Sequence, residues 1–237
     1  FAARGRTIAY DQPPYGLSAK PEAGDWSGPN PYGKAAVLDQ LFAVMDGLGV
    51  ERAVLVGSSS GGTLALEAAL ARPDRVQALL LVAPWVYARR PTLPTWLAHL
   101  PQMRRLSVLI ARKLGTSTLL RLSYANPEAI TPERMDLARI HTRIARWDLA
   151  WGALLDHSLT TPVDVGDRLG SVTQPTLLVT GDRDRLVPPA DTERVAAGLP
   201  QAELRVLPGC GHLPQEECPG PFLEAVGPWL DRLAPSP

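Results

Sequence analysis

The chain has 237 residues, 45% of them hydrophobic, which is enough to bury a full core as one large domain or as one domain with an insertion. Its 24 Lys and Arg residues balance its 24 Asp and Glu residues, so its charge favours neither nucleic acid nor an anionic membrane as a partner. No apolar run approaches the ~20 residues that a membrane-spanning helix needs.

The chain contains two cysteines, Cys210 and Cys218, which are too few for a disulfide framework. We expect both to be free thiols. The sequence leaves the compartment open, with the cytoplasm favoured. It carries no cluster of metal-binding residues, and we expect neither a metal nor an organic cofactor.

Strand-like and helix-like segments alternate in the first third of the chain. A short β-prone run covers Thr7–Tyr10 and ends in turn residues. The later segments are predicted as a helix over Tyr32–Leu48, a strand over Ala53–Val56, a helix over Thr63–Ala71 and a strand over Ala78–Val82. Because the last two strands are continuously apolar, we expect them to be buried on both faces in a parallel sheet.

The pattern changes between residues 85 and 161, where no strand is predicted. Amphipathic helices are expected over Leu93–Leu114, Thr116–Tyr124 and Pro132–Leu155. Thr131 is placed to cap the last of these helices, with Pro132 at its first position. Residues 85–161 are therefore predicted to form a helical insertion in an α/β core made of residues 1–84 and 162–237.

Alternation resumes in the last third of the chain. We predict strands over Thr176–Val179 and Leu204–Leu207, and helices over Asp191–Ala197 and Pro219–Leu233, the latter bent at Pro228. The resulting fold class is α/β, with a mostly parallel sheet covered by helices. Ligands bind at the carboxyl ends of the strands in such sheets.

A candidate nucleophile follows the strand that begins at Ala53. Gly57–Gly61 fits G-x-S-x-G, in which Ser59 occupies a strained turn between a strand and a helix. We expect that glycine is required at positions 57 and 61 because a side chain there would keep the strand and the helix from packing closely. The Ser60 N–H would donate to a developing oxyanion at the helix N-terminus. A Ser/Gly-rich turn or a phosphate loop is the alternative, but a P-loop requires a lysine that is absent here.

A serine nucleophile requires a base, and the chain has four histidines. His99, His141 and His157 fall in the helical insertion, where structural roles are expected. His212 lies in a loop after the last strand and is our candidate base. An acidic group must then orient it, and Asp182 and Asp184 both follow a strand.

The order Ser59, Asp184, His212 resembles that of the α/β-hydrolase superfamily. Residues 11–18 are similar to its D-x-P/R-G-x-G-x-S turn, although Pro14 replaces a glycine. Residues 181–188 resemble its G-x-x-D-x-x-V-P segment, in which the acid comes three residues after the glycine, so the resemblance selects Asp184. Residues 211–219 resemble its G-H-x-x-x-x-E-x-P ending, and the insertion resembles its helical cap.

The resemblance implies that the run ending at Tyr10 is the fourth strand of this fold. The third strand, which would lie beside the strand that precedes Ser59, is not found in these residues, nor is the His-Gly loop that supplies a second oxyanion donor. A sheet without that strand would leave backbone groups unpaired, which is costly. We therefore expect an additional N-terminal segment, in the same chain or in a separate one, to complete the sheet.

The predicted activity is that of a serine hydrolase that cleaves a small or medium carboxylic ester through an acyl-enzyme on Ser59. The same triad would serve a C–C bond hydrolase, a lactonase or a prolyl aminopeptidase. A protein of this fold that binds a small ligand without catalysis is the alternative of another class. The substrate pocket is expected in the cap, where four tryptophans line it or form its core: Trp85, Trp96, Trp147 and Trp151.

Overall fold

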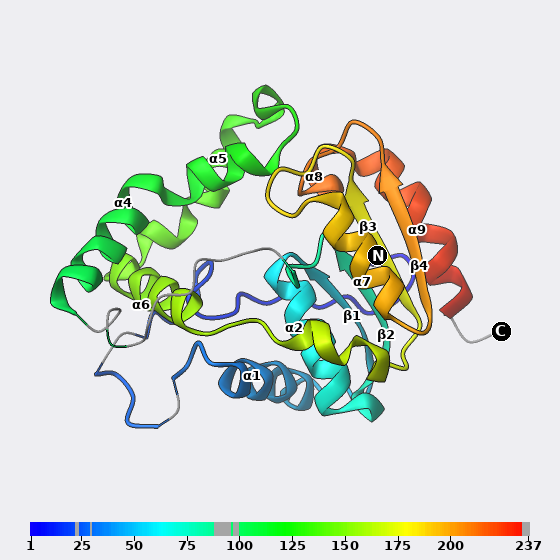
Figure 1. Cartoon of the computed structure of the whole chain (residues 1–237), viewed down its shortest axis with the longest axis horizontal. Helices are drawn as coiled ribbons and strands as arrows, with labels where there is room; N and C mark the ends of the chain where they lie inside the picture. The colour runs from blue at the N-terminus through cyan, green and yellow to red at the C-terminus, as the bar shows by residue number, and fades with distance from the viewer. Residues whose placement is uncertain (22–23, 29, 88–95, 97–99, 234–237) are drawn as a thin grey trace.

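The computed structural model describes residues 1–21, 24–28, 30–87, 96 and 100–233. Within these residues, four parallel strands form one sheet in the order β1-β2-β3-β4 (Figure 1). The strands are β1 (Ala53–Ser58), β2 (Val76–Val82), β3 (Thr176–Gly181) and β4 (Ala202–Leu207). Each contains a predicted strand and extends it by two residues. Because all four are parallel, their carboxyl ends lie at the same edge of the sheet.

The sheet is covered by helices that alternate with the strands along the chain. These helices are α1 (Lys34–Gly47), α2 (Ser60–Ala71), α7 (Pro189–Gly198), α8 (Pro214–Glu217) and α9 (Pro219–Leu233). Short 3-10 turns η1 (Pro73–Arg75) and η4 (Val165–Ser171) precede β2 and β3. The predicted helices that correspond to α1, α2, α7 and α9 are confirmed to within three residues at each end. Pro228 lies inside α9 as expected.

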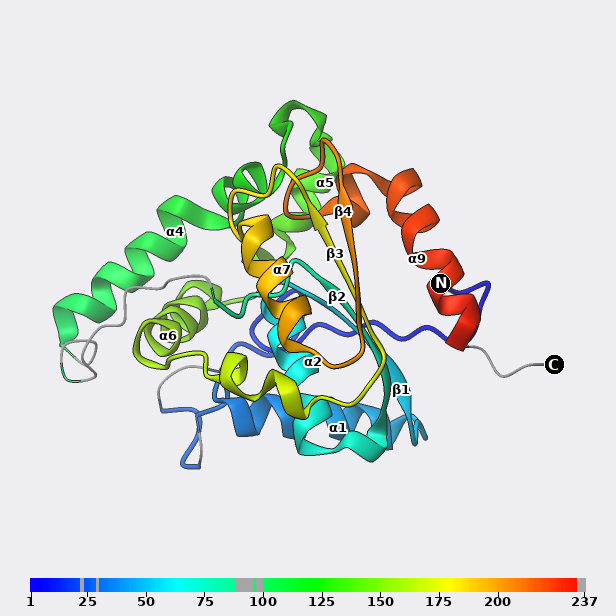
Figure 2. The same ribbon diagram turned by 45° about the vertical axis from the view of Figure 1, so that its right-hand side comes forward.

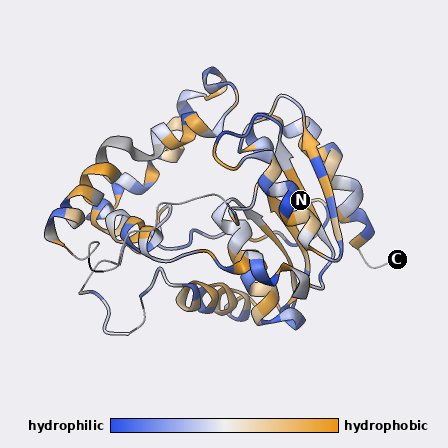
Figure 3. Cartoon of the chain, in the orientation of Figure 1, coloured by the Kyte–Doolittle hydropathy of each residue, from blue (hydrophilic) through white to orange (hydrophobic). Residues whose placement is uncertain are grey.

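Two hydrophobic cores lie on opposite faces of the sheet because side chains alternate along a strand. Leu79 and Leu81 of β2 pack with apolar residues of α1, α2, η4 and α7. Leu80 and Val82 face the other way and pack with Phe222 and other residues of α9. Figure 2 shows α9 apart from α1, α2 and α7, and Figure 3 shows apolar residues on much of α1 and of the strands. The expected doubly covered sheet is therefore present.

The strand β1 differs from its prediction because it lies at the edge of the sheet. It pairs with β2 on one side and with no other strand among the residues described. It is consequently only half-buried, and Val56 is 55% exposed. Thr7–Tyr10, predicted as a strand, enters no strand pairing within the described residues, since its backbone lacks a neighbouring strand. The expected additional N-terminal strands stay a prediction.

Residues 100–161 of the helical insertion contain three α-helices, which Figure 1 shows away from the sheet. They are α4 (Pro101–Ser123), α5 (Pro132–Ala138) and α6 (Trp147–Thr160), with 3-10 turns η2 (Pro127–Ala129) and η3 (Ile140–Arg143) between them. Thr131 caps α5 by accepting from the N–H of Arg134. None of the helices within the described residues is both long and apolar enough to cross a bilayer.

Two helix predictions in the insertion were wrong. The segments predicted on either side of residue 115 form one continuous helix, α4. The helix predicted over Pro132–Leu155 is instead divided into α5, η3 and α6. Arg146 interrupts it with a φ of 62°, a left-handed conformation that a right-handed helix cannot continue through. The predicted helix start at Leu93 lies outside the described residues.

Candidate active site

Ser59 occupies a sharp turn between β1 and α2. Its φ of 54° and ψ of −119° lie outside the regions that residues with a side chain normally adopt, which costs about 1–3 kcal/mol. Surrounding bonds hold the turn: the Ser59 N–H donates to the Val82 carbonyl at 2.8 Å, and the Ser59 carbonyl accepts from the Trp85 N–H at 3.0 Å. The strained elbow predicted from the sequence is therefore present.

Two glycines allow close packing around this turn, Gly57 between β1 and α2 and Gly62 between α2 and the loop after β2. A Cβ on Gly57 would lie 2.3 Å from the Gly61 carbonyl oxygen, and one on Gly62 would lie 2.8 Å from Pro84 Cβ. A Cβ on Gly61 would meet nothing within 4 Å beyond its own helix. The expectation was thus right for Gly57 and wrong for Gly61, because it is Gly62 that faces the loop after β2.

The serines on either side of Ser59 have different surroundings. The Ser58 hydroxyl is buried and has no hydrogen-bond partner among the residues that the structure describes, whereas Ser60 is exposed. Ser60 is the first residue of α2, so its N–H has no acceptor within the helix. That N–H belongs to the positive end of the helix, which suits it to stabilise negative charge.

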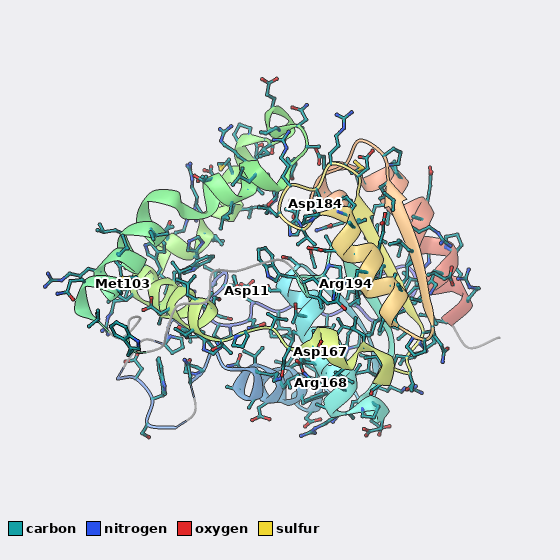
Figure 4. All side chains as sticks on the ribbon, in the orientation of Figure 1. Asp11, Met103, Asp167, Arg168, Asp184 and Arg194 are labelled. Atoms are coloured by element: carbon teal, nitrogen blue, oxygen red, sulfur yellow. A yellow bond between two sulfur atoms is a disulfide. The ribbon has the colours of Figure 1, made fainter. Side chains whose placement is uncertain are left out.

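Asp184 and His212 form a buried pair beyond β3 and β4. The His212 Nδ1–H donates to Asp184 Oδ2 at 2.7 Å, which leaves Nε2 free to accept a proton. The other oxygen of Asp184 accepts from the N–H groups of Leu186 and Val187 at 2.8 and 2.9 Å. Asp182 instead accepts from the Gly209 N–H at 2.7 Å and shapes the turn after β4. Figure 4 labels Asp184 at the end of β3 that lies toward α5 and α8.

The three predicted triad residues follow β1, β3 and β4 and so lie beyond the same edge of the sheet. The structure joins Asp184 to His212 directly, but no hydrogen bond joins the Ser59 hydroxyl to the His212 ring. Such contacts are often long in enzymes without a ligand and tighten when substrate binds. The roles of Ser59, Ser60, Asp184 and His212 stay predictions.

The two cysteines form a disulfide, which corrects the expectation of free thiols. Cys210 and Cys218 have Cα atoms 6.2 Å apart, within the range that a disulfide spans. The bridge closes the loop that carries His212. Their spacing of eight residues was the only signal in the sequence, and it could not show that the chain turns back between β4 and α9.

The remaining candidate residues lie in the insertion. His141 is buried and contacts the rings of Trp147 and Trp151, each with centroids 5.0 Å apart. Burial lowers the pKa of His141. Trp96 is 68% exposed, so this tryptophan belongs to no core. His99 lies outside the described residues.

The turn predicted at residues 11–18 is compact and contacts the insertion. The Asp11 carboxylate accepts from the Leu17 N–H at 2.9 Å. Gly16 has a φ of 49°, and a Cβ there would overlap the Asp11 carboxylate. The Tyr15 ring meets Trp151 of α6 edge-on with centroids 5.5 Å apart. In Figure 4 Asp11 is labelled between α6 and α2.

Residues 2–219 match the sequence profile of the family described as the alpha/beta hydrolase fold. The chain belongs to the α/β-hydrolase family. The superfamily resemblance and the fold class predicted from the sequence are both confirmed.

Individual relatives of this α/β hydrolase carry more specific names. A 2-hydroxy-6-oxononadienedioate/2-hydroxy-6-oxononatrienedioate hydrolase from Cupriavidus pinatubonensis is 31% identical over 75% of the chain, and the match spans 61% of that protein's length. A meta-cleavage product hydrolase from Pseudomonas fluorescens superimposes with a TM-score of 0.72 at 20% identity, over 92% of this chain and 77% of that one. A thermophilic esterase from Thermogutta terrifontis gives a TM-score of 0.60 at 25% identity, over 84% and 72%.

Proposed function

We propose that this α/β hydrolase is a serine hydrolase in which Ser59 attacks a carbonyl carbon. The observation that carries the proposal is the buried contact between His212 Nδ1 and Asp184 Oδ2, at the edge of the sheet where the strained Ser59 turn also lies. In this role the Asp184 carboxylate holds the imidazole with Nε2 directed to accept the serine proton. The Ser60 N–H stabilises the oxyanion that forms.

The reaction proceeds in two stages. Ser59 adds to the carbonyl as His212 takes its proton, and the leaving group departs with that proton to give an acyl-enzyme. His212 then takes a proton from water as the water oxygen adds to the acyl carbon, and it returns that proton to the Ser59 oxygen as the acid is released.

The substrate class favoured by the relatives is a 2-hydroxy-6-oxo unsaturated acid. In such a compound the oxo carbon is attacked, and the C–C bond beside it breaks. A proton must first move from the 2-hydroxyl to C5, which leaves a 2-oxo group and a C3=C4 double bond. The electron pair of the broken C5–C6 bond then passes through that double bond to the C2 oxygen, which takes up a proton. Water thus supplies the hydroxyl of the new carboxylic acid and the hydrogen of the second product.

A carboxylic ester is the second candidate substrate. The structural likeness to the Thermogutta terrifontis esterase supports it, and the same residues would act in the same order. Only the leaving group changes, from a carbon to an alkoxide oxygen.

The insertion at residues 85–161 is proposed to be a cap over the site. The Tyr15–Trp151 contact supports this assignment, because it ties α6 to the turn at residues 11–18 of the core. The backbone bond from the His212 N–H to the Ser123 carbonyl, 2.7 Å long, ties the end of α4 to the base.

Labelling by a fluorophosphonate probe tests the nucleophile. We expect the purified protein to be labelled at Ser59, and the variants Ser59→Ala and His212→Ala to remain unlabelled. Ser60→Ala is the matched control, because it removes the neighbouring hydroxyl and keeps the backbone N–H. If the protein is never labelled, the non-catalytic ligand-binding alternative is favoured.

A substrate panel then identifies the bond that is cleaved. It compares 2-hydroxy-6-oxo-6-phenylhexa-2,4-dienoate, p-nitrophenyl esters and a prolyl anilide. We expect the highest kcat/KM on the dienoate. A higher value on the esters would assign an esterase, and one on the anilide would assign an aminopeptidase.

A further inference from the structure

The loop that carries His212 is bonded to the end of α4, which lies about ninety residues earlier in the chain. The His212 N–H donates to the Ser123 carbonyl at 2.7 Å. The residue before it, Gly211, is packed so closely that a Cβ would lie 2.5 Å from that same carbonyl oxygen and 2.6 Å from the Ala125 nitrogen. The backbone of the base loop therefore rests directly on the segment that leaves the insertion.

One carboxylate joins these two segments. Glu217 Oε2 accepts from the N–H groups of Gly211 and Ala125 at 2.7 and 3.0 Å. Its Oε1 accepts from the Asn126 N–H at 2.8 Å. A charged acceptor that receives three N–H donors makes stronger bonds than a neutral one. All three donors are backbone groups, so the contact fixes the path of the chain on both sides.

We infer that Glu217 is a positioning residue for His212. It holds the base loop against the end of α4, while Asp184 holds the ring. The backbone of His212 is thus fixed at its own N–H and, through Glu217, at Gly211. The ring is fixed at Nδ1. The inference rests on the proposed function, because it assigns Glu217 a task only if His212 is the base.

The adjacent carboxylate, Glu216, provides a matched comparison on the same short helix. It accepts from the Tyr124 hydroxyl at 3.0 Å and from Arg134 Nη2 at 2.9 Å. Its carboxylate therefore bonds the insertion as that of Glu217 does, but within the described part of the chain its partners are side chains of the insertion and none belongs to the loop of His212. Loss of Glu216 removes charge and an ion pair while leaving the base loop anchored.

The test measures the maximal rate and the half-saturating concentration of fluorophosphonate labelling, together with the thermal unfolding midpoint. We expect Glu217→Ala to lower the maximal rate about 10- to 100-fold with the half-saturating concentration little changed, because a small displacement of a catalytic group costs this much. Glu216→Ala should stay within about twofold of the unsubstituted rate, since a surface ion pair contributes little.

Two conservative variants separate positioning from folding. Glu217→Gln should retain most of the rate, because its remaining oxygen can take the place of Oε2 and keep the bonds from Gly211 and Ala125. Glu217→Asp keeps the charge but is one methylene shorter, and should lose an intermediate amount of rate.

Several outcomes would overturn the inference. One is a Glu217→Ala protein with a lower unfolding midpoint but an unchanged rate per folded molecule. Another is an equal loss of rate in Glu216→Ala. If Glu217→Ala does not fold, a Glu217→Asp protein with the unsubstituted rate would also overturn it. An unsubstituted protein that is not labelled at all would instead refute the proposed function itself.

Discussion

The Asp184 carboxylate meets His212 Nδ1 at 2.7 Å, with both side chains withdrawn from solvent. Each oxygen of Asp184 has a separate task. Oδ2 accepts from the imidazole, and Oδ1 accepts from two backbone N–H groups. The backbone bonds to Oδ1 therefore hold the carboxylate in place while Oδ2 orients the imidazole ring. Replacing the carboxylate by an amide tests the bond to His212 separately from the bonds to the backbone.

Asp184→Asn should lower kcat about 10⁴-fold with little loss of stability. The amide oxygen can keep the bonds from Leu186 and Val187, so the NH₂ group would face His212 and force the unsuitable tautomer. Steady-state kinetics and a urea midpoint measure the two quantities. Asp182→Asn is the control, because its oxygen still accepts from Gly209, and it should remain active. Equal losses in both variants would contradict the assignment of Asp184.

Gly57→Ala should destabilise the fold by about 1–3 kcal/mol, because its Cβ would overlap the backbone of α2. Gly61→Ala, four residues away in the same motif, should leave stability unchanged or raise it by about 0.5–1 kcal/mol, since it adds a better helix former in open space. Urea midpoints of the two variants check this. A Gly61→Ala protein less stable than Gly57→Ala would refute the packing argument.

Reduction of the Cys210–Cys218 disulfide should lower the free energy of unfolding by about 2.5 kcal/mol, because it removes the entropic effect of a cross-link between cysteines with a sequence separation of 8. The labelling rate of Ser59 should fall as well, because the bridge restrains the loop of His212. Thermal unfolding and probe labelling with and without dithiothreitol measure both effects. In a variant with Ser at both cysteine positions, dithiothreitol should change neither the unfolding midpoint nor the labelling rate. A change in that variant would show that the reductant does not act through the disulfide.

Acidification should weaken the insertion through His141. Burial lowers the pKa of this residue in the folded protein below its ordinary value of about 6.5, and the nearby Lys20 acts in the same direction. Between the lowered and the ordinary pKa the unfolded chain binds more protons. The free energy of unfolding therefore falls as the pH decreases through this window.

The test compares urea midpoints at about pH 7.5 and about pH 5.5. We expect the midpoint of His141→Gln to fall less on acidification than that of the unsubstituted protein. His157→Gln serves as the control because it removes another histidine of the insertion, one that is only half-buried. An equal pH response in all three proteins would be inconsistent with a buried neutral His141.

The sequence by itself determined the local features. Periodicity and turn chemistry located the four strands of the described sheet and the helices α1, α2, α7 and α9, but not the short helix α8, since these features depend on residues close together in the chain. The same local rules placed Ser59 at a strained turn and Thr131 at a helix start. They also set the order of the motifs that identified the family.

Only the tertiary structure decided which distant groups meet. It paired Asp184 with His212, joined Cys210 to Cys218, crowded Gly62 rather than Gly61, and gave Glu217 its three backbone donors. Each of these contacts depends on how loops and helices pack across the sheet. The separation of two residues along the sequence does not determine that packing. The exposure of Val56 has the same origin, because an apolar strand is buried on both sides only where neighbouring elements cover it.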